Sequence, residues 1–283
     1  MCKLKSGIVL KNKIFMPDYD SHSDMLKELG IDDNFIGATK KFVRVELSPE
    51  NGDPFSDIDG WILKVDQDIR PEWWSEEEYK PQIIEKVKEW AKTHIFVGVD
   101  GLKLNTGTNY YIKDCKDVEV WESSSVEAWG SSSVVARGSS SVEAWGSSSV
   151  EACDTATVKA YGSASVEAYG SASVEAYGSA SVEACGSATV KACDTATVEA
   201  YGSASVEACG SASVKAYGSA SVEACGSAVV FNSLYIPWEN QSSLILSENA
   251  TFKDNIGKVI YQSGDFKLVS VESGKTISEC KVP

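Results

Sequence analysis

Valine recurs at every eighth position from Val118 to Val230, in fifteen copies without an insertion or a deletion. The unit at residues 162–169 reads GSASVEAY, in which small apolar residues alternate with polar or bulky ones. This alternation is the two-residue period of a β-strand. Glycine flanked by serine returns in most units, which excludes a helix. The alternative for such a composition is a flexible linker, but a linker has no reason to keep valine in register.

The even period keeps one face of the chain inward in every unit, and the turns carry Gly, or Asp at Asp154 and Asp194. A single short strand cannot bury its own face, so successive coils must stack on one another. The inward residues are only valine and alanine, so the two inner faces must lie close together. We therefore predict a mainly β fold, an octapeptide-repeat β-solenoid with two sides and two units per coil, which is 16 residues. The alternative is a three-sided coil of three units.

The outward position three residues after each valine from Val118 to Val222 carries Trp, Tyr, Cys or Arg. Exposed aromatic side chains in a contiguous row are typical of interaction surfaces. Single-base codon changes connect most of these residue types, so drift among duplicated units is the alternative explanation. The candidate binding stripe consists of Trp129, Trp145, Tyr161 and Tyr177. A protein, a glycan or another copy of the chain could bind it.

Five of the eight cysteines fall on this same outward position: Cys153, Cys185, Cys193, Cys209 and Cys225. A cross-linking scheme would place cysteines in fixed pairs, and this pattern does not. We therefore expect reduced thiols whose side chains point in parallel, and no disulfide framework. We also expect no metal site, because a flat ladder offers a line of sulfurs and not a tetrahedral cluster.

The residue after each valine is usually glutamate, and a 16-residue coil stacks these residues in two rows. One row has four consecutive carboxylates: Glu119, Val135, Glu151, Glu167, Glu183, Glu199 and Lys215. The other row contains two lysines: Glu127, Glu143, Lys159, Glu175, Lys191, Glu207 and Glu223. Like charges on neighbouring strands destabilise a sheet. The sequence therefore predicts that the isolated solenoid melts at a higher temperature near pH 5 than near pH 8.

The flanking segments do not repeat. Residues 1–99 are predicted to form a small α+β domain, with strands at 7–10, 13–16, 42–47, 61–65 and 95–99 and helices at 23–30 and 79–94. Residues 100–230 form the solenoid, with regular repeats over 118–230, and residues 231–283 form a β-rich carboxy-terminal cap. The ends of a solenoid expose unpaired backbone, so both flanking segments are explained as caps.

Catalytic candidates are few. Asp20, His22 and Asp24 form a polar cluster suited to acid–base chemistry or a cation, but Asp and Ser are also the usual residues at a helix start. His94, the only other histidine, ends a predicted helix and is interpreted as structural. The sequence has no phosphate-binding loop, nucleophile elbow or metal-ligand spacing. We expect no enzymatic activity, no cofactor and no metal.

The net charge of −15 argues against nucleic acid and anionic membranes as partners. No apolar run approaches the roughly 20 residues of a membrane helix, and the start of the chain lacks the apolar core of a signal peptide. The sequence thus predicts a protein of the host-cell cytoplasm or of a virion, not one secreted by a signal peptide. Proteins and glycans remain open as partners, as does self-association.

Residues 1–115 carry the segments DSHSDML, FVRVELSP, GWILKVDQDIRPEWW and GVDGL ahead of the short tandem repeats. With them the chain resembles uncharacterised bacterial and bacteriophage proteins in which a domain of unknown function precedes a variable repeat tract. The resemblance implies a phage or prophage setting. It implies no activity and no site residues.

The leading interpretation is a non-enzymatic structural or binding protein that presents a repetitive Glu/Tyr/Trp/Cys surface. One alternative is a ligand-binding or enzymatic amino-terminal domain carried on a solenoid spacer. Another is an adaptor or decoy that binds a host protein. A deep pocket at His22 would favour the first alternative over the leading interpretation.

Overall fold

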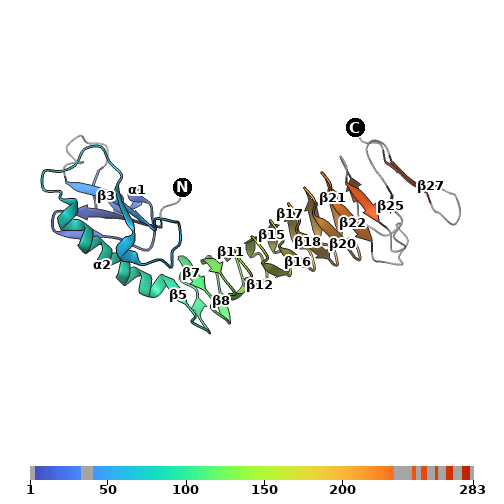
Figure 1. Ribbon diagram of the computed structural model, residues 1–283, viewed down its shortest axis with the longest axis horizontal. Coiled ribbons are helices and arrows are strands. Elements are labelled where there is room, and N and C mark those ends of the chain that lie inside the picture. The colour runs from blue at the N-terminus through green and yellow to red at the C-terminus, as the bar shows by residue number, and fades with distance from the viewer. Residues whose placement is uncertain are drawn as a thin grey trace. The chain divides into compact units, whose positions relative to one another are not determined.

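The computed structural model describes residues 4–32 and 41–232, together with short segments at 244–246, 250–253, 259–260, 266–269 and 276–280 (Figure 1). The chain divides into two compact units, Met1–Val97 and Gly98–Pro283. The division falls close to the expected end of the amino-terminal domain. Among the described residues, neither helix is both long and apolar enough to cross a membrane.

The first unit contains an antiparallel four-stranded sheet in the order β2-β1-β3-β4. Its strands are β1 (Lys5–Leu10), β2 (Lys13–Phe15), β3 (Phe42–Ser48) and β4 (Ile62–Val65), and β5 (Ile95–Val97) follows the second helix. Burial alternates along most of β3, whereas five of the six residues of β1 are buried. The predicted strands are therefore confirmed, with ends that shift by one to two residues.

Two helices cover opposite faces of this sheet. Neighbouring residues in a strand point to opposite sides, so the apolar Ile8 and Val9 of β1 lie on different faces and each face needs a cover. Helix α1 (His22–Glu28) packs Met25 and Leu26 against Ile8 of β1. Helix α2 (Glu76–His94) packs Ile83 and Val87 against the other face. Both begin at a serine, Ser21 and Ser75, whose hydroxyl accepts a hydrogen bond from the backbone three residues later. A short 3-10 turn, η2 (Ile58–Gly60), precedes β4.

The second unit is a β-solenoid made of two parallel sheets whose strands alternate along the chain (Figure 1). One sheet contains β6 (Lys103–Leu104), β8 (Val118–Val120), β10 (Ser133–Ala136), β12 (Ser149–Ala152), β14 (Ser165–Ala168), β16 (Ser181–Ala184), β18 (Thr197–Ala200), β20 (Ser213–Ala216) and β22 (Val229–Asn232). The other contains β7 (Asn109–Lys113), β9 (Ser125–Trp129), β11 (Ser141–Ala144), β13 (Thr157–Ala160), β15 (Ser173–Ala176), β17 (Thr189–Ala192), β19 (Ser205–Ala208) and β21 (Ser221–Ala224).

The strand register confirms the two-sided coil of 16 residues. Val126 pairs with Val142, and Val134 pairs with Val150. From Val118 to Val230 the inward valines are at most 3% exposed, and nearly all the inward alanines are fully buried. A three-sided coil would leave a wider interior that valine and alanine cannot fill, because protein interiors are close-packed.

The corners of the coils have a left-handed backbone. At Gly186 φ is +71°, and an added Cβ would lie 3.2 Å from the carbonyl oxygen of Gly170 one coil earlier. Asp154 and Asp194 take this position with φ of 58° and 56°. The Asp154 carboxylate accepts a hydrogen bond of 3.1 Å from the Gly138 N–H in the preceding coil. Glycine is used where the backbone needs positive φ, and aspartate is tolerated because its side chain bonds locally.

Parallel pairing begins before the regular repeats. Tyr110 and Ile112 of β7 lie over Val126 and Ala128, so larger side chains close this end of the valine and alanine core. At the other end β23 (Leu244–Leu246) and β24 (Thr251–Lys253) continue the two sheets in parallel. In the region expected as a cap, β25 (Val259–Ile260) pairs antiparallel with β24, and β26 (Phe266–Val269) pairs antiparallel with β27 (Thr276–Cys280). The rest of that region lies outside the described residues.

Candidate binding surface

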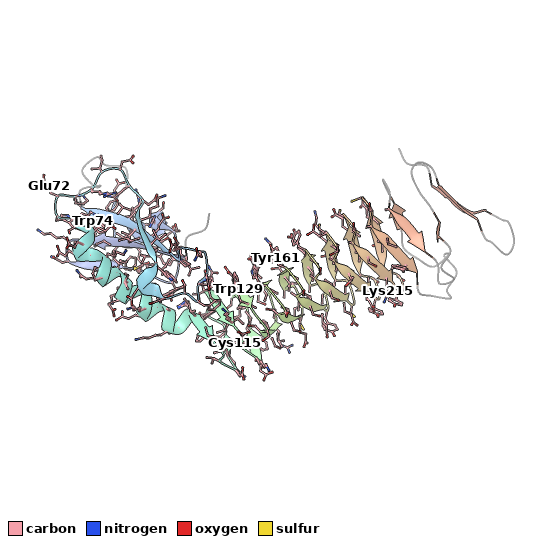
Figure 2. All side chains as sticks on the ribbon, in the orientation of Figure 1. Glu72, Trp74, Cys115, Trp129, Tyr161 and Lys215 are labelled. Atoms are coloured by element: carbon pink, nitrogen blue, oxygen red, sulfur yellow. The ribbon has the colours of Figure 1, made fainter. Side chains whose placement is uncertain are left out.

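The 16-residue coil sorts the outward corner side chains into two rows, because units two apart share one side of the solenoid. The aromatic–thiol row runs Trp129, Trp145, Tyr161, Tyr177, Cys193, Cys209 and Cys225. The mixed row runs Trp121, Arg137, Cys153, Tyr169, Cys185, Tyr201 and Tyr217. The candidate stripe residues therefore form one continuous part of a single row, in which Trp129 and Tyr161 are labelled in Figure 2.

The four aromatic rings of the aromatic–thiol row stack face to face. Ring centroids lie 5.4 Å apart for Trp129 and Trp145, 4.1 Å for Trp145 and Tyr161, and 5.3 Å for Tyr161 and Tyr177. The interplanar angles are 10° to 18°. The rings of Trp145 and Tyr161 are therefore covered on both faces, and those of Trp129 and Tyr177 on one face each. Stacked aromatic pairs stabilise a fold by about 0.5–1.5 kcal/mol beyond the area that they bury.

The mixed row has shorter stacks. The Arg137 guanidinium lies 5.3 Å from the ring centroid of Trp121, and the rings of Tyr201 and Tyr217 lie 4.5 Å apart. Neither contact could be read from one repeat unit, because the partners are 16 residues apart in the sequence. Cation–π and stacking contacts here link successive coils.

Tyrosine hydroxyls bind the glutamates two residues before them. Tyr169 donates to Glu167 at 2.8 Å and Tyr177 donates to Glu175 at 2.9 Å. These hydrogen bonds raise the pKa of Tyr169 and of Tyr177 to about 12, because ionised tyrosine could no longer donate to the carboxylate. In an extended strand residues i and i+2 share a face, so the repeated Glu-Ala-Tyr sequence produces this contact. Sequence reasoning missed it although the spacing is visible.

The strand register confirms both glutamate rows. Glu151, Glu167 and Glu183 are direct neighbours on adjacent strands. Two of the three lysines in these rows bridge successive coils: Lys215 lies 2.8 Å from Glu199, and Lys191 lies 3.6 Å from Glu207. The two kinds of environment shift pKa values in opposite directions. Desolvation, with the nearby charge of Glu143, raises the pKa of Glu127, whereas the hydrogen bond from Lys215 lowers that of Glu199.

Neutralising these two glutamates should therefore change stability with opposite signs. A carboxylate with a raised folded-state pKa destabilises the fold above that pKa, so Glu127→Gln should raise the melting temperature at pH 8 by roughly 1–2 °C. Glu199 has a lowered pKa and stabilises the fold above its unfolded pKa, so Glu199→Gln should lower the melting temperature at pH 8. Both differences should shrink toward pH 3.5, where the carboxyls protonate. Melting followed by circular dichroism tests this prediction, and changes in melting temperature of the same sign at pH 8 would contradict it.

The higher melting temperature of the whole solenoid near pH 5 than near pH 8 stays a prediction.

Removing the central ring of the stack should weaken the solenoid. Trp145→Ala loses contacts with both Trp129 and Tyr161, and we expect it to lower the free energy of unfolding by roughly 2–3 kcal/mol. Tyr169→Ala is the control, because this ring is 37% exposed and lies between two cysteines of its row. The Tyr169→Ala substitution should lower the free energy of unfolding by less than about 1 kcal/mol. Equal losses in a urea titration would show that stacking contributes little.

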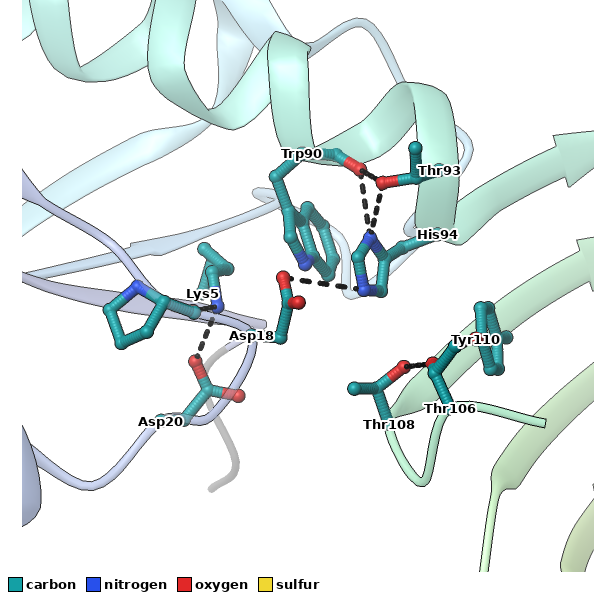
Figure 3. Close-up of polar contacts among 10 residues, drawn as sticks. Lys5, Asp18, Asp20, Trp90, Thr93, His94, Thr106, Thr108 and Tyr110 are labelled. Carbon is teal, nitrogen blue, oxygen red and sulfur yellow. Dashed lines mark hydrogen bonds and ion pairs between the residues drawn. The ribbon is translucent and has the colours of Figure 1, made fainter. Parts of the chain in front are cut away.

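The polar cluster of the first unit does not form one site. Asp20 accepts hydrogen bonds from the Ser6 N–H at 3.0 Å and from the buried Lys5 ammonium, which also donates to the Pro17 carbonyl (Figure 3). Asp24 lies in the first turn of α1, where its backbone N–H is capped by Ser21. Asp20 thus serves to neutralise a buried lysine, which is required when a charge is buried.

His22 instead lies near two acids from other elements. Its Nε2 donates to the Val45 carbonyl at 3.2 Å, and its Nδ1 lies 3.6 Å from the Asp66 carboxylate. The ligand atoms of His22, Glu46 and Asp66 all lie within 4.8 Å of one another. No sequence signal connects these residues, because β3 and the end of β4 bring Glu46 and Asp66 beside α1.

The hollow beside this group is open and mixed in charge. It has a volume of about 570 Å³ and is lined by Arg44, Lys64, Val65, Asp66, Gln67, Asp68 and Ile69. Lys64 also pairs with Glu46 in the strand register. Basic groups therefore stand close to both carboxylates, and the hollow that they line is open to solvent.

His94 has a full set of contacts. Its Nδ1 lies 2.9 Å from the Trp90 carbonyl and 2.8 Å from Thr93 Oγ1, its Nε2 lies 3.5 Å from Asp18, and its ring stacks on Trp90 (Figure 3). Both ring nitrogens of this buried histidine therefore have polar partners, as buried polar groups in folded proteins generally do. These contacts fit the structural interpretation of this histidine.

Among the cysteines whose side chains the structure describes, no disulfide is formed. The expectation of parallel thiols is wrong for one pair: the sulfurs of Cys209 and Cys225 lie 2.9 Å apart. Corner residues lie just beyond the strand ends, so rotation about their side-chain bonds decides where the sulfur points.

Comparison with protein-family models, with curated protein sequences and with solved structures finds no match to this chain.

Proposed function

We propose that the chain is a non-enzymatic structural or binding protein whose solenoid presents repeated rows of glutamate, tyrosine, tryptophan and cysteine. The observation that supports this most is the alignment of equivalent residues on successive strands, as for Glu151, Glu167 and Glu183. Neighbouring strands are about 4.8 Å apart, so the rows offer a partner many equal contacts at a fixed spacing. Many weak contacts at fixed spacing give avidity.

The aromatic stack favours a protein partner over a glycan. Sugars bind aromatic side chains through the face of the ring, and neighbouring rings cover both faces of Trp145 and Tyr161 and one face each of Trp129 and Tyr177. Ring edges beside rows of carboxylates suit a flat basic protein surface, which electrostatic complementarity would bring to the solenoid. The resemblance of residues 1–115 to bacterial and bacteriophage proteins supports a phage or prophage setting for that partner.

The experiment captures partners from bacterial lysate on the full-length protein and compares two triple variants. Glu151→Gln/Glu167→Gln/Glu183→Gln neutralises three neighbours in one solenoid row. Glu77→Gln/Glu85→Gln/Glu89→Gln is the control, because it removes the same charge from exposed positions of α2 in the first unit. We expect a partner that both the wild type and the control retain and that the solenoid variant loses. Loss only in the control would contradict the proposal.

A second candidate function is ligand binding by the first unit, with the solenoid as a spacer. The observation that favours it is the approach of His22 to Glu46 and Asp66 described above. An imidazole and two carboxylates suit a divalent first-row metal ion. Titration of the full-length protein with Zn²⁺ tests it, with His22→Gln as the variant and Asp68→Asn on the same turn as the control. Binding that His22→Gln does not weaken would exclude this site.

A further inference from the structure

The aromatic–thiol row ends in three cysteines on consecutive coils, Cys193, Cys209 and Cys225. The register places β17, β19 and β21, which precede these cysteines, side by side. In the mixed row the two cysteines have no cysteine beside them: Cys185 lies between Tyr169 and Tyr201. A contact between thiols on adjacent coils is therefore confined to one row of the repeat region.

The backbone around Cys209 and Cys225 is fixed, and their sulfurs meet. The N–H of Cys209 donates to the Ala192 carbonyl at 2.8 Å, and that of Cys225 donates to the Ala208 carbonyl at 2.8 Å. Adjacent strands hold the two Cα atoms about 4.8 Å apart, which is inside the range for a disulfide. The Sγ atoms are already 2.9 Å apart, so a bond of about 2.05 Å needs a movement of less than about 1 Å.

We propose that Cys209 and Cys225 form a thiol-oxidation site, at which a small-molecule disulfide converts the two thiols into a disulfide between adjacent coils. A thiolate of the pair attacks the small disulfide, giving a mixed disulfide and one released thiol. The second cysteine then attacks the mixed disulfide and releases the second small thiol. Two S–H bonds and one S–S bond are broken, and one S–S bond and two S–H bonds are formed, so the step balances.

Cys193 is a weaker competitor for this reaction, because the sulfur–sulfur contact in this row joins Cys209 to Cys225. Burial, together with the neighbouring Cys209, raises the pKa of the Cys193 thiol, which lowers its share of reactive thiolate. Both Cys209 and Cys225 are half-buried, so a small disulfide can reach them. The new bond would close the coil between β19 and β21 and restrict the unfolded chain there, which raises the melting temperature.

The test treats the full-length protein under native conditions with glutathione disulfide and counts the remaining thiols. Tryptic cleavage after Lys191, Lys215 and Lys253 separates the pair into peptides 192–215 and 216–253. We expect the loss of two thiols, the two peptides joined until reduced, a monomeric chain on a non-reducing gel, and a melting temperature raised by several degrees. Cys193→Ser should leave the cross-link in place, which assigns it to Cys209.

Cys185→Ser is the matched control, because it removes a half-buried corner cysteine from the mixed row, and it should also retain the cross-link. Cys209→Ser should lose both the cross-link and the rise in melting temperature. Joined peptides that persist in Cys209→Ser, a cross-link only between chains, or no loss of thiols in the folded wild type would each overturn the proposal. Circular dichroism of every reduced variant checks that the solenoid is folded.

Discussion

Val174→Asp is expected to unfold the middle of the solenoid. Val174 is 1% exposed and lies between Val158 and Val190 in the stack of inward valines. The substitution removes a buried apolar side chain and puts a carboxylate in a core of valine and alanine, where nothing can pair with it. Either effect alone is large, and together we expect a loss of at least about 4 kcal/mol. Circular dichroism and limited proteolysis would detect melting of the coils around β15.

Ser173→Asp is the control, because it adds the same carboxylate one residue earlier on the exposed face of β15. The free energy of unfolding should change by no more than about 0.5 kcal/mol. In a solenoid each coil contacts only its neighbours, so cleavage in Val174→Asp should begin near the substitution. A Val174→Asp protein as stable as Ser173→Asp would mean that the interior is not the dry, close-packed core described above.

Gly186→Val is expected to destabilise the solenoid by roughly 2–4 kcal/mol, through strain at a corner. The residue has φ of +71°, which valine adopts only at a cost, and the new Cβ would approach the Gly170 carbonyl oxygen to 3.2 Å. Urea denaturation of the full-length protein measures the loss.

Gly186→Asp is the matched control, because the chain itself carries Asp154 and Asp194 at this position of the repeat. The Asp194 carboxylate accepts a hydrogen bond of 3.0 Å from the Gly178 N–H one coil earlier. By the same geometry the introduced carboxylate would accept a hydrogen bond from the Gly170 N–H, and stability should change by less than about 1 kcal/mol. If aspartate were as damaging as valine, the positive φ would not be what selects glycine here.

The local sequence pattern was enough to predict the strands and helices and the 16-residue coil of the solenoid. The eight-residue period fixes which side chains point inward, and the small size of valine and alanine fixes how close the two sheets must be. Those two facts imply that Val126 lies over Val142, which the register confirms. In the first unit both predicted helices are found, but the second begins at Glu76 behind its Ser75 cap, three residues before the predicted start.

Side-chain partners were not predictable, because they depend on rotamers and on segments far apart in the chain. The sequence suggested that Asp20, His22 and Asp24 belong together, but Asp20 binds Lys5 and His22 meets Glu46 and Asp66. The repeat likewise implied parallel thiols, but the sulfurs of one pair turn toward each other.

The sequence by itself therefore predicted the solenoid, its coil of two repeat units and the residues of each outward row, because the period fixes which side chains point inward and the small valine and alanine side chains favour two close sheets. The tertiary structure alone decided what those rows consist of physically: rings that cover one another, tyrosines bound to glutamates, and Cys209 against Cys225. The repeat period determines which face of the solenoid a residue lies on and which coil it belongs to. Whether two side chains touch depends also on the backbone conformation of the corner and on the direction of each side chain.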